Sequence, residues 1–131
     1  MTIRRATCSC GQLQVTTRVE PIRVSMCHCI ACQRRTGSVF GLQARFPRSE
    51  VNIEGRATQY TRVADSGQKI TFSFCPECGA TVHYFQNHLP EIIAVPVGAF
   101  GDPAFPSPAF SVYESRMHPW LTLNATMEHH D

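Results

Sequence analysis

The sequence predicts a single, mainly β domain with little helix. Short segments in which apolar and polar side chains alternate recur along the chain, and this alternation is the period of a half-buried strand. Turn residues separate these segments, and no long stretch shows the 3.6-residue period of an amphipathic helix. A length of 131 residues suits one domain with a modest hydrophobic core.

The expected elements follow this alternation along the chain. The first clear strand covers residues 13–19 and ends before Pro21, because proline interrupts the ladder of a sheet. Residues 30–36 lack glycine and proline, which favours a short helical turn that Gly37 ends. Further strands are expected at 22–28, 39–46, 51–53, 58–63, 69–74, 80–85, 92–97 and 110–117, with a proline-rich loop at 101–109. The domain is expected to span residues 1–125, followed by a flexible tail at 126–131.

Composition narrows the classes of partner. The net charge is only +2, and the arginine pairs Arg4-Arg5 and Arg34-Arg35 are not the basic stripe that follows a phosphate backbone. We therefore expect no nucleic-acid partner. The second pair could bind the carboxylates of a small substrate, but we favour its interpretation as a solvated helix face. No apolar run approaches the ~18 residues of a membrane span, so no membrane partner is expected either. A homodimer is compatible with the sequence.

The cysteine count points to metal. The chain has seven cysteines, an odd number that intrachain disulfides cannot use completely. No apolar run follows Arg4-Arg5, so no signal peptide is visible and a cytoplasmic location is expected. In a reducing compartment, clustered cysteines hold metal more often than they form disulfides.

The most informative stretch is residues 27–32, with the sequence CHCIAC. In an extended segment Cys27 and Cys29 point to one face, while His28 points away from them. The two residues between Cys29 and Cys32 give the spacing of a metal knuckle, in which both sulfurs meet one ion. We therefore predict that three sulfurs, the triad, converge on one point.

The remaining cysteines form two half-sites. Cys8 and Cys10 lie two residues apart, and Cys75 and Cys78 have knuckle spacing around Pro76. Together they make the closed four-sulfur site of structural zinc, whereas the triad leaves a fourth position open, as catalytic zinc does. The alternative, a knuckle from the triad combined with the second half-site, would strand three cysteines in two places, so we disfavour it. Two zinc ions per chain are expected.

A zinc ion with three thiolate ligands favours sulfur chemistry. Sulfur donation makes the ion a weak activator of water, but the ion still binds a fourth thiol and deprotonates it. A thiolate is a nucleophile, so the site suits addition of a small thiol to an aldehyde, or the reverse cleavage of a carbon–sulfur bond. Ser38 and the backbone after Gly37 are the nearest candidates in sequence for stabilising the alkoxide that forms.

These motifs resemble those of the glutathione-dependent formaldehyde-activating enzyme family, which also includes centromere protein V. The resemblance covers about residues 5–120 and rests on Cys8-x-Cys10-Gly11, Cys27-His28-Cys29-x-x-Cys32, Gly37-Ser38-x-Phe40 and Phe74-Cys75-x-x-Cys78-Gly79. It implies a β-tent fold in which the outer four cysteines hold structural zinc and the middle three hold catalytic zinc. It also implies a carbon–sulfur lyase or synthase that joins glutathione and formaldehyde as S-hydroxymethylglutathione.

Alternative interpretations remain open for several of these residues. A distant His83, His88 or His118 could close the triad and make its zinc structural. The chain would then be a non-catalytic, zinc-scaffolded module that binds a protein or chromatin partner, as the resemblance to centromere protein V permits. His28 is expected to be a packed or supporting histidine rather than a ligand. Trp120 is expected in the core.

Overall fold

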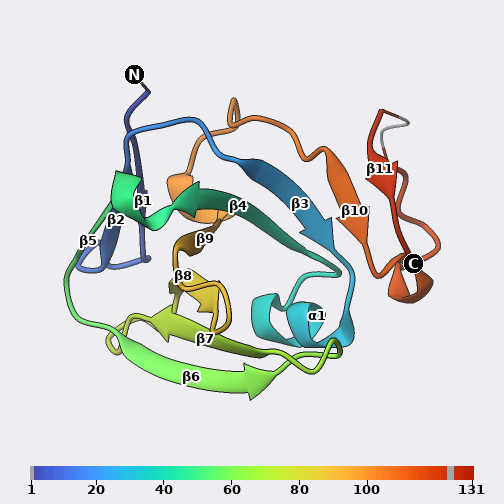
Figure 1. The fold of residues 1–131 in the computed structure, drawn as a ribbon, viewed down its shortest axis with the longest axis horizontal. Helices are drawn as coiled ribbons and strands as arrows, with labels where there is room; N and C mark the ends of the chain where they lie inside the picture. The colour runs from blue at the N-terminus through green and yellow to red at the C-terminus, as the bar shows by residue number, and fades with distance from the viewer. Residues whose placement is uncertain (1, 124–125) are drawn as a thin grey trace.

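The computed structural model describes residues 2–123 and 126–131, which form two β-sheets and one short helix (Figure 1). The smaller sheet has three antiparallel strands in the order β1-β2-β5. Its strands are β1 (Arg4–Thr7), β2 (Gln14–Thr17) and β5 (Val51–Glu54). The prediction of a mainly β fold with little helix is confirmed.

The larger sheet has eight strands in the order β11-β10-β3-β4-β9-β8-β7-β6. Its pairings are antiparallel except at β10, which runs parallel to both β3 and β11. The sheet curves, so that β3 and β4 lie across from β7 and β6 in Figure 1. The strands are β3 (Arg23–Cys27), β4 (Gly41–Pro47), β6 (Thr58–Val63), β7 (Lys69–Phe74), β8 (Thr81–Gln86), β9 (Ile92–Pro96), β10 (Phe110–Val112) and β11 (Glu128–His129).

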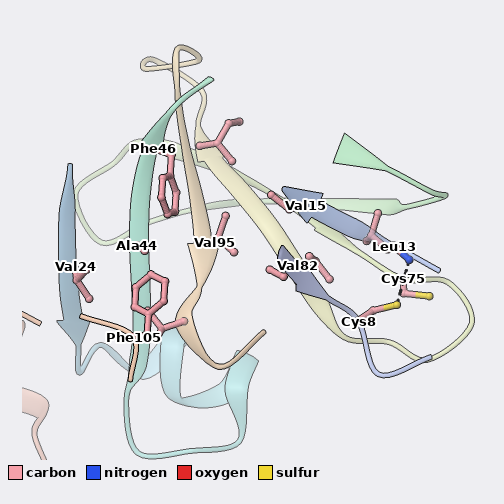
Figure 2. Packing of buried hydrophobic residues seen from close by; sticks show 13 residues of the cluster. Cys8, Leu13, Val15, Val24, Ala44, Phe46, Cys75, Val82, Val95 and Phe105 are labelled. Atoms are coloured by element: carbon pink, nitrogen blue, oxygen red, sulfur yellow. Dashed lines mark hydrogen bonds between the residues drawn. The ribbon is translucent and has the colours of Figure 1, made fainter. Parts of the chain in front are cut away.

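Alternation along the strands gives the large sheet two different faces. Even-numbered residues of β3 and β4, such as Val24, Ala44 and Phe46, belong to the main hydrophobic core with Val15 of β2 and Val95 of β9 (Figure 2). Odd-numbered residues of the same two strands point to the opposite, concave face. The sheet therefore separates the core from the space enclosed by its own curve.

The short helix and its end at Gly37 agree with the prediction from the sequence. Helix α1 covers Ile30–Thr36 and ends at Gly37, whose φ of 73° is the left-handed conformation that glycine adopts without strain. At the other end Cys29 is the N-cap, and its Sγ accepts a hydrogen bond from the backbone N–H of Cys32 at 3.3 Å. The helix packs against β4, and Arg35 reaches the rings of Phe72 and Tyr84 on the opposite wall.

The end of the chain differs from expectation. The strand expected over 110–117 is only β10, because Tyr113 adopts a φ of 57° and the chain continues as the 3₁₀ helix η3. Residues 126–131, expected as a flexible tail, contain β11, which pairs with β10. Trp120 is 68% exposed and so lies outside the core where we expected it. The 3₁₀ helices are η1 (Arg48–Glu50), η2 (Val97–Phe100) and η3 (Glu114–Arg116).

No helix in the described part of the chain combines the length and the apolar character that crossing a bilayer requires.

Candidate metal centres and cavity

Four cysteines from distant parts of the chain meet at one edge of the core. The Sγ atoms of Cys8, Cys10, Cys75 and Cys78 all lie within 4.8 Å of one another. The Sγ atoms of Cys8 and Cys10 are 3.6 Å apart, and those of Cys10 and Cys75 are 3.7 Å apart. A tetrahedron with Zn–S bonds of about 2.3 Å has edges of about 3.8 Å, so the arrangement fits a four-thiolate zinc ion.

The surrounding chain provides hydrogen bonds to these sulfurs. The backbone N–H of Leu13 donates to Cys8 Sγ at 3.3 Å, and the backbone N–H of Glu77 donates to Cys75 Sγ at 3.3 Å. Gln12 Nε2 donates to Cys75 Sγ at 2.9 Å. Burial alone would raise the pKa of Cys75, but these donors and the N–H of Cys78 outweigh it and lower the pKa to about 6. These hydrogen bonds therefore favour the thiolate at Cys75, the form that binds metal.

The other three cysteines form a second, separate cluster. Cys27 ends β3, Cys29 caps α1, and Cys32 lies in the first turn of α1; all three are buried and their Sγ atoms lie within 4.8 Å of one another. Hydrogen bonds from the Cys27 and Cys32 thiols lower the pKa of Cys29, while the hydrogen bond with Cys29 raises the pKa of Cys27. Three neighbouring sulfurs cannot all ionise unless a cation compensates them, so the donor set fits a metal ion.

Within residues 2–123 and 126–131, no histidine lies close enough to the triad to act as a ligand. The four-sulfur and three-sulfur clusters are the only groups in these residues with metal-ligand spacing. Of the histidines considered as an alternative fourth ligand, His83 is buried in β8, and burial lowers its pKa to about 4. His118 Nε2 lies 3.0 Å from Gln33 Oε1. His28 is fully buried, with Nε2 2.9 Å from Ser111 Oγ, so it is a packed side chain, as the alternation predicted.

The triad opens into a cavity on the concave face of the large sheet. Its volume is about 140 Å³, which is roughly ten times what one water molecule requires. The odd-numbered side chains of β3 and β4 form one wall, and residues of β6, β7, β8 and β9 line the rest of the cavity. Besides the triad, the residues that line the cavity include Arg23, Ser25, Gln43, Arg45, Arg62, Asp65, Phe72, Tyr84 and Tyr113.

Hydrogen-bonded polar groups line part of this cavity. Tyr84 Oη donates to Gln43 Oε1 at 2.5 Å, and Gln43 Nε2 donates to Ser25 Oγ at 3.2 Å. Burial raises the pKa of Tyr84, which keeps its hydroxyl protonated and able to donate. These bonds hold the Gln43 side chain between Ser25 of β3 and Tyr84 of β8.

Tyr113 lies beside the triad and lines the same cavity. Its side chain packs against the three cysteines and lines the cavity. Burial and the charge of Cys27 raise its pKa, so the phenol is a hydrogen-bond donor at neutral pH. Among the described residues it is the only non-glycine with positive φ, a conformation that costs energy and often marks a functional site.

Two residues singled out in the sequence lie elsewhere. Ser38 is exposed, its backbone N–H donates to Thr36 Oγ1 at 3.0 Å, and it is not among the residues that line the cavity. Arg35 does not form the solvated face expected of the Arg34-Arg35 pair, because its guanidinium packs 5.2 Å from the ring centroid of Phe72 and 5.0 Å from that of Tyr84.

The sequence analysis missed the arginines and tyrosines of the cavity. A partial signal was present, since Arg23 and Ser25 share the alternation of Cys27 within the expected strand 22–28. Arg62, Tyr84 and Tyr113 come from strands and turns whose positions depend on long-range pairing, so sequence spacing alone does not indicate them.

Comparisons with known proteins bear on the fold and on the family of this chain. A solved structure of a Rhodobacter sphaeroides protein matches with a TM-score of 0.59 and 23% identity, over 76% of this chain and 91% of that chain. This likeness shows the shared fold. No curated protein matches. A sequence profile of the family described as glutathione-dependent formaldehyde-activating enzyme matches residues 3–116. Because that match covers most of the domain, the chain belongs to the glutathione-dependent formaldehyde-activating enzyme family.

Proposed function

We propose that this protein binds two zinc ions and uses the one at the triad to add a small thiol to a small aldehyde. The reactants we propose are glutathione and formaldehyde, and the product is S-hydroxymethylglutathione, so the enzyme is a carbon–sulfur lyase or synthase. The zinc at Cys8, Cys10, Cys75 and Cys78 is structural, because four protein sulfurs close its coordination sphere. The family match supports the substrate pair.

One observation carries the catalytic assignment. Cys27, Cys29 and Cys32 are buried together and they line a cavity large enough for an organic substrate. A zinc ion bound there lowers the pKa of a thiol that takes the open position. In the described residues no histidine or carboxylate joins the cluster, so the cavity would give a substrate thiol access to the open position.

The proposed reaction forms one carbon–sulfur bond. The substrate sulfur attacks the aldehyde carbon, the carbonyl π electrons move to oxygen, and the proton lost from the thiol ends on the new hydroxyl. Tyr113 lines the cavity beside the triad and donates a hydrogen bond to the oxygen as charge develops there. We assign to Tyr113 the role for which Ser38 and the backbone after Gly37 are the nearest candidates in sequence.

The test is a comparison of Cys29→Ala with Ile30→Ala in zinc-loaded protein. Exchange spectroscopy by NMR measures how fast formaldehyde and glutathione interconvert with their adduct, above the uncatalysed background. Cys29→Ala should reduce the rate to background while the domain stays folded, because a ligand of the triad is lost. Ile30 is the neighbouring residue, is 44% exposed and does not line the cavity, so Ile30→Ala should retain the wild-type rate. A Cys29→Ala protein with wild-type turnover would refute the assignment.

A further inference from the structure

The pairing of β3 with β4 arranges the cavity wall in three successive levels. Cys27 lies opposite Gly41, Ser25 lies opposite Gln43, and Arg23 lies opposite Arg45. Strand residues two apart point to the same face, so Cys27, the Ser25–Gln43 pair and the Arg23–Arg45 pair all face the cavity. The wall therefore changes from sulfur through neutral polar groups to positive charge.

The Arg23–Arg45 pair is unfavourable for the protein alone. Like charges directly opposite each other on neighbouring strands are destabilising. Neither side chain forms an ion pair with a carboxylate among the described residues, and Arg23 Nε is buried with no hydrogen-bond partner. Asp65, an acidic residue of the same cavity, pairs with Arg116 instead, at 3.7 Å.

The surroundings of both guanidinium groups favour an anion. Arg23 is held with its Cζ 4.0 Å from the ring centroid of Phe110, a cation–π contact that does not use its N–H donors. Burial, and then the charge of Arg23, lower the pKa of Arg45. Both effects disfavour the positive charge of Arg45, and the opposite charge of a bound carboxylate would offset them.

We propose that Arg23 and Arg45 form an anion subsite that binds a carboxylate of the thiol substrate while its sulfur occupies the triad. This inference rests on the proposed function, and it specifies the class of thiol: one that carries a carboxylate at a distance from its sulfur. Bidentate pairing between guanidinium and carboxylate suits this role.

The length of the wall selects the size of the substrate. Arg23 and Cys27 are four residues apart on one strand, so their Cα atoms are about 13 Å apart at the usual strand rise. The long arginine side chains shorten the distance that a ligand must span. A thiol as small as cysteine is still too short to place its sulfur at the triad and its carboxylate at the arginines. A tripeptide-sized thiol spans them, with Ser25 and Gln43 beside its polar backbone.

The experiment compares acid and ester forms of one thiol on the full-length, metal-loaded chain at fixed ionic strength. Calorimetric titration measures the Kd of glutathione, of its diethyl ester and of S-methylglutathione in the wild type and in Arg23→Gln and Arg45→Gln. We expect the wild type to bind glutathione about 10- to 100-fold more tightly than the diester, the range of charge-assisted hydrogen bonds. Each variant should lose most of this preference because it weakens binding of the acid, not of the ester.

Controls separate the subsite from general charge and from folding. Arg34→Gln removes an exposed arginine that does not line the cavity, so it should keep the wild-type preference. The Tm of Arg45→Gln should equal or exceed that of the wild type, because the substitution relieves repulsion between like charges. If that variant melts early, Arg45→Lys provides the conservative alternative and should keep part of the preference through its retained charge.

The outcomes distinguish this inference from the proposed function. Cobalt-loaded protein reports sulfur coordination through its absorption spectrum, and S-methylglutathione should bind through its carboxylates without the spectral change that glutathione produces. An acid-to-ester preference that is unchanged in both arginine variants overturns the subsite, even if glutathione still changes the spectrum. Arginine-dependent binding of glutathione without any spectral change supports the anion subsite, but it refutes the placement of the sulfur at the triad and with it the proposed function. No saturable binding by any of the three ligands overturns both.

Discussion

At the scale of single residues, we assign hydrogen-bond donation in the cavity to Tyr113 rather than to the cysteines that bind metal. Tyr113 lies against the triad in a backbone conformation that costs energy for any residue except glycine. The chain keeps this conformation at the point where β10 ends and η3 begins, which turns the side chain toward the cavity. The raised pKa ensures that a proton remains available for donation.

Replacing Tyr113 with phenylalanine tests this role. If the phenol donates to the developing alkoxide, Tyr113→Phe should lower kcat by about 100-fold, the usual effect of losing one such donor. The Kd for glutathione should change little, because the ring and its packing remain. Adduct exchange by NMR gives the rate, and calorimetry gives the Kd. Tyr60→Phe removes an exposed hydroxyl from β6 outside the cavity and should leave both values unchanged. Equal rates for Tyr113→Phe and the wild type would eliminate Tyr113 as the donor.

Residue types and local spacing predicted the cysteine groups but not the tyrosines. The knuckle spacings of Cys29–Cys32 and Cys75–Cys78 are local, so they can be read directly from the sequence. Tyr113 reaches the triad only because β10 pairs in parallel with β3, which aligns Val112 with Cys27. Because β3 and β10 lie far apart in the sequence, no local pattern indicates the contact between Tyr113 and the triad.

At the scale of elements, β4 and α1 together set the shape of the triad. Gly41 of β4 lies opposite Cys27, and the helix passes close to it. A Cβ added at Gly41 would lie 3.3 Å from Cys32 Cβ and 3.2 Å from a terminal guanidinium nitrogen of Arg35. These contacts are tight, so the absence of a side chain at Gly41 allows Cys32 to approach the other two sulfurs.

Substituting Gly41 by alanine should therefore displace Cys32 and weaken metal binding at the triad. We expect Gly41→Ala to hold one zinc firmly at the four-cysteine site and to lose the second on dialysis, with the fold intact. The measurement is zinc content per chain by elemental analysis, alongside thermal melting. Gly98→Ala is the matched control, because a Cβ at that position meets nothing within 4 Å, and it should retain both ions. Two firmly bound zinc ions in Gly41→Ala would show that β4 does not constrain the triad.

Local elements were also easier to predict than their arrangement. The short helix over 30–36 and its termination at Gly37 follow from residues within one or two turns. The eight-stranded order places β4 beside β9 and β3 beside β10, partners that lie far apart in the chain. The tail strand β11 was missed for the same reason, because its polar sequence is ordered by pairing with β10 rather than by burial.

At the scale of the whole molecule, two cysteine clusters have different structural roles. The four-cysteine cluster connects the turn between β1 and β2 to the turn between β7 and β8, and it borders the main core in Figure 2. Metal bound there crosslinks positions 65 residues apart, and such binding contributes free energy of folding directly. The triad lies within one continuous segment and makes no comparable crosslink.

Cysteine substitutions should therefore differ in their effect on folding. Cys78→Ala is expected to yield insoluble or unfolded protein, because the crosslink fails and three thiolates remain without a fourth partner. Cys29→Ala is the matched comparison and should fold, since its site connects only neighbouring residues. Solubility and cooperative melting measure the difference. A Cys78→Ala protein with wild-type stability would disprove a structural role for this cluster.

Chelation should remove the two ions in sequence. The triad has three protein ligands and opens to a cavity, so a mild chelator should extract one equivalent of zinc while the fold persists. Stronger chelation should then remove the second equivalent, with unfolding. Zinc release measured with a colorimetric chelator and followed together with circular dichroism tests this order. Release of both equivalents in a single step that coincides with unfolding would indicate two closed, structural sites.

X-ray absorption of the zinc- or cobalt-loaded protein, titrated with glutathione, tests the central claim most directly. The account predicts that the triad metal begins with three sulfur ligands and one light atom, and that it shifts to four sulfurs as the thiol saturates. The four-cysteine site should contribute an unchanged four-sulfur signal throughout. A triad metal that already carries a protein histidine as its fourth ligand, and that saturating glutathione does not alter, would contradict the account and favour a zinc-scaffolded binding module.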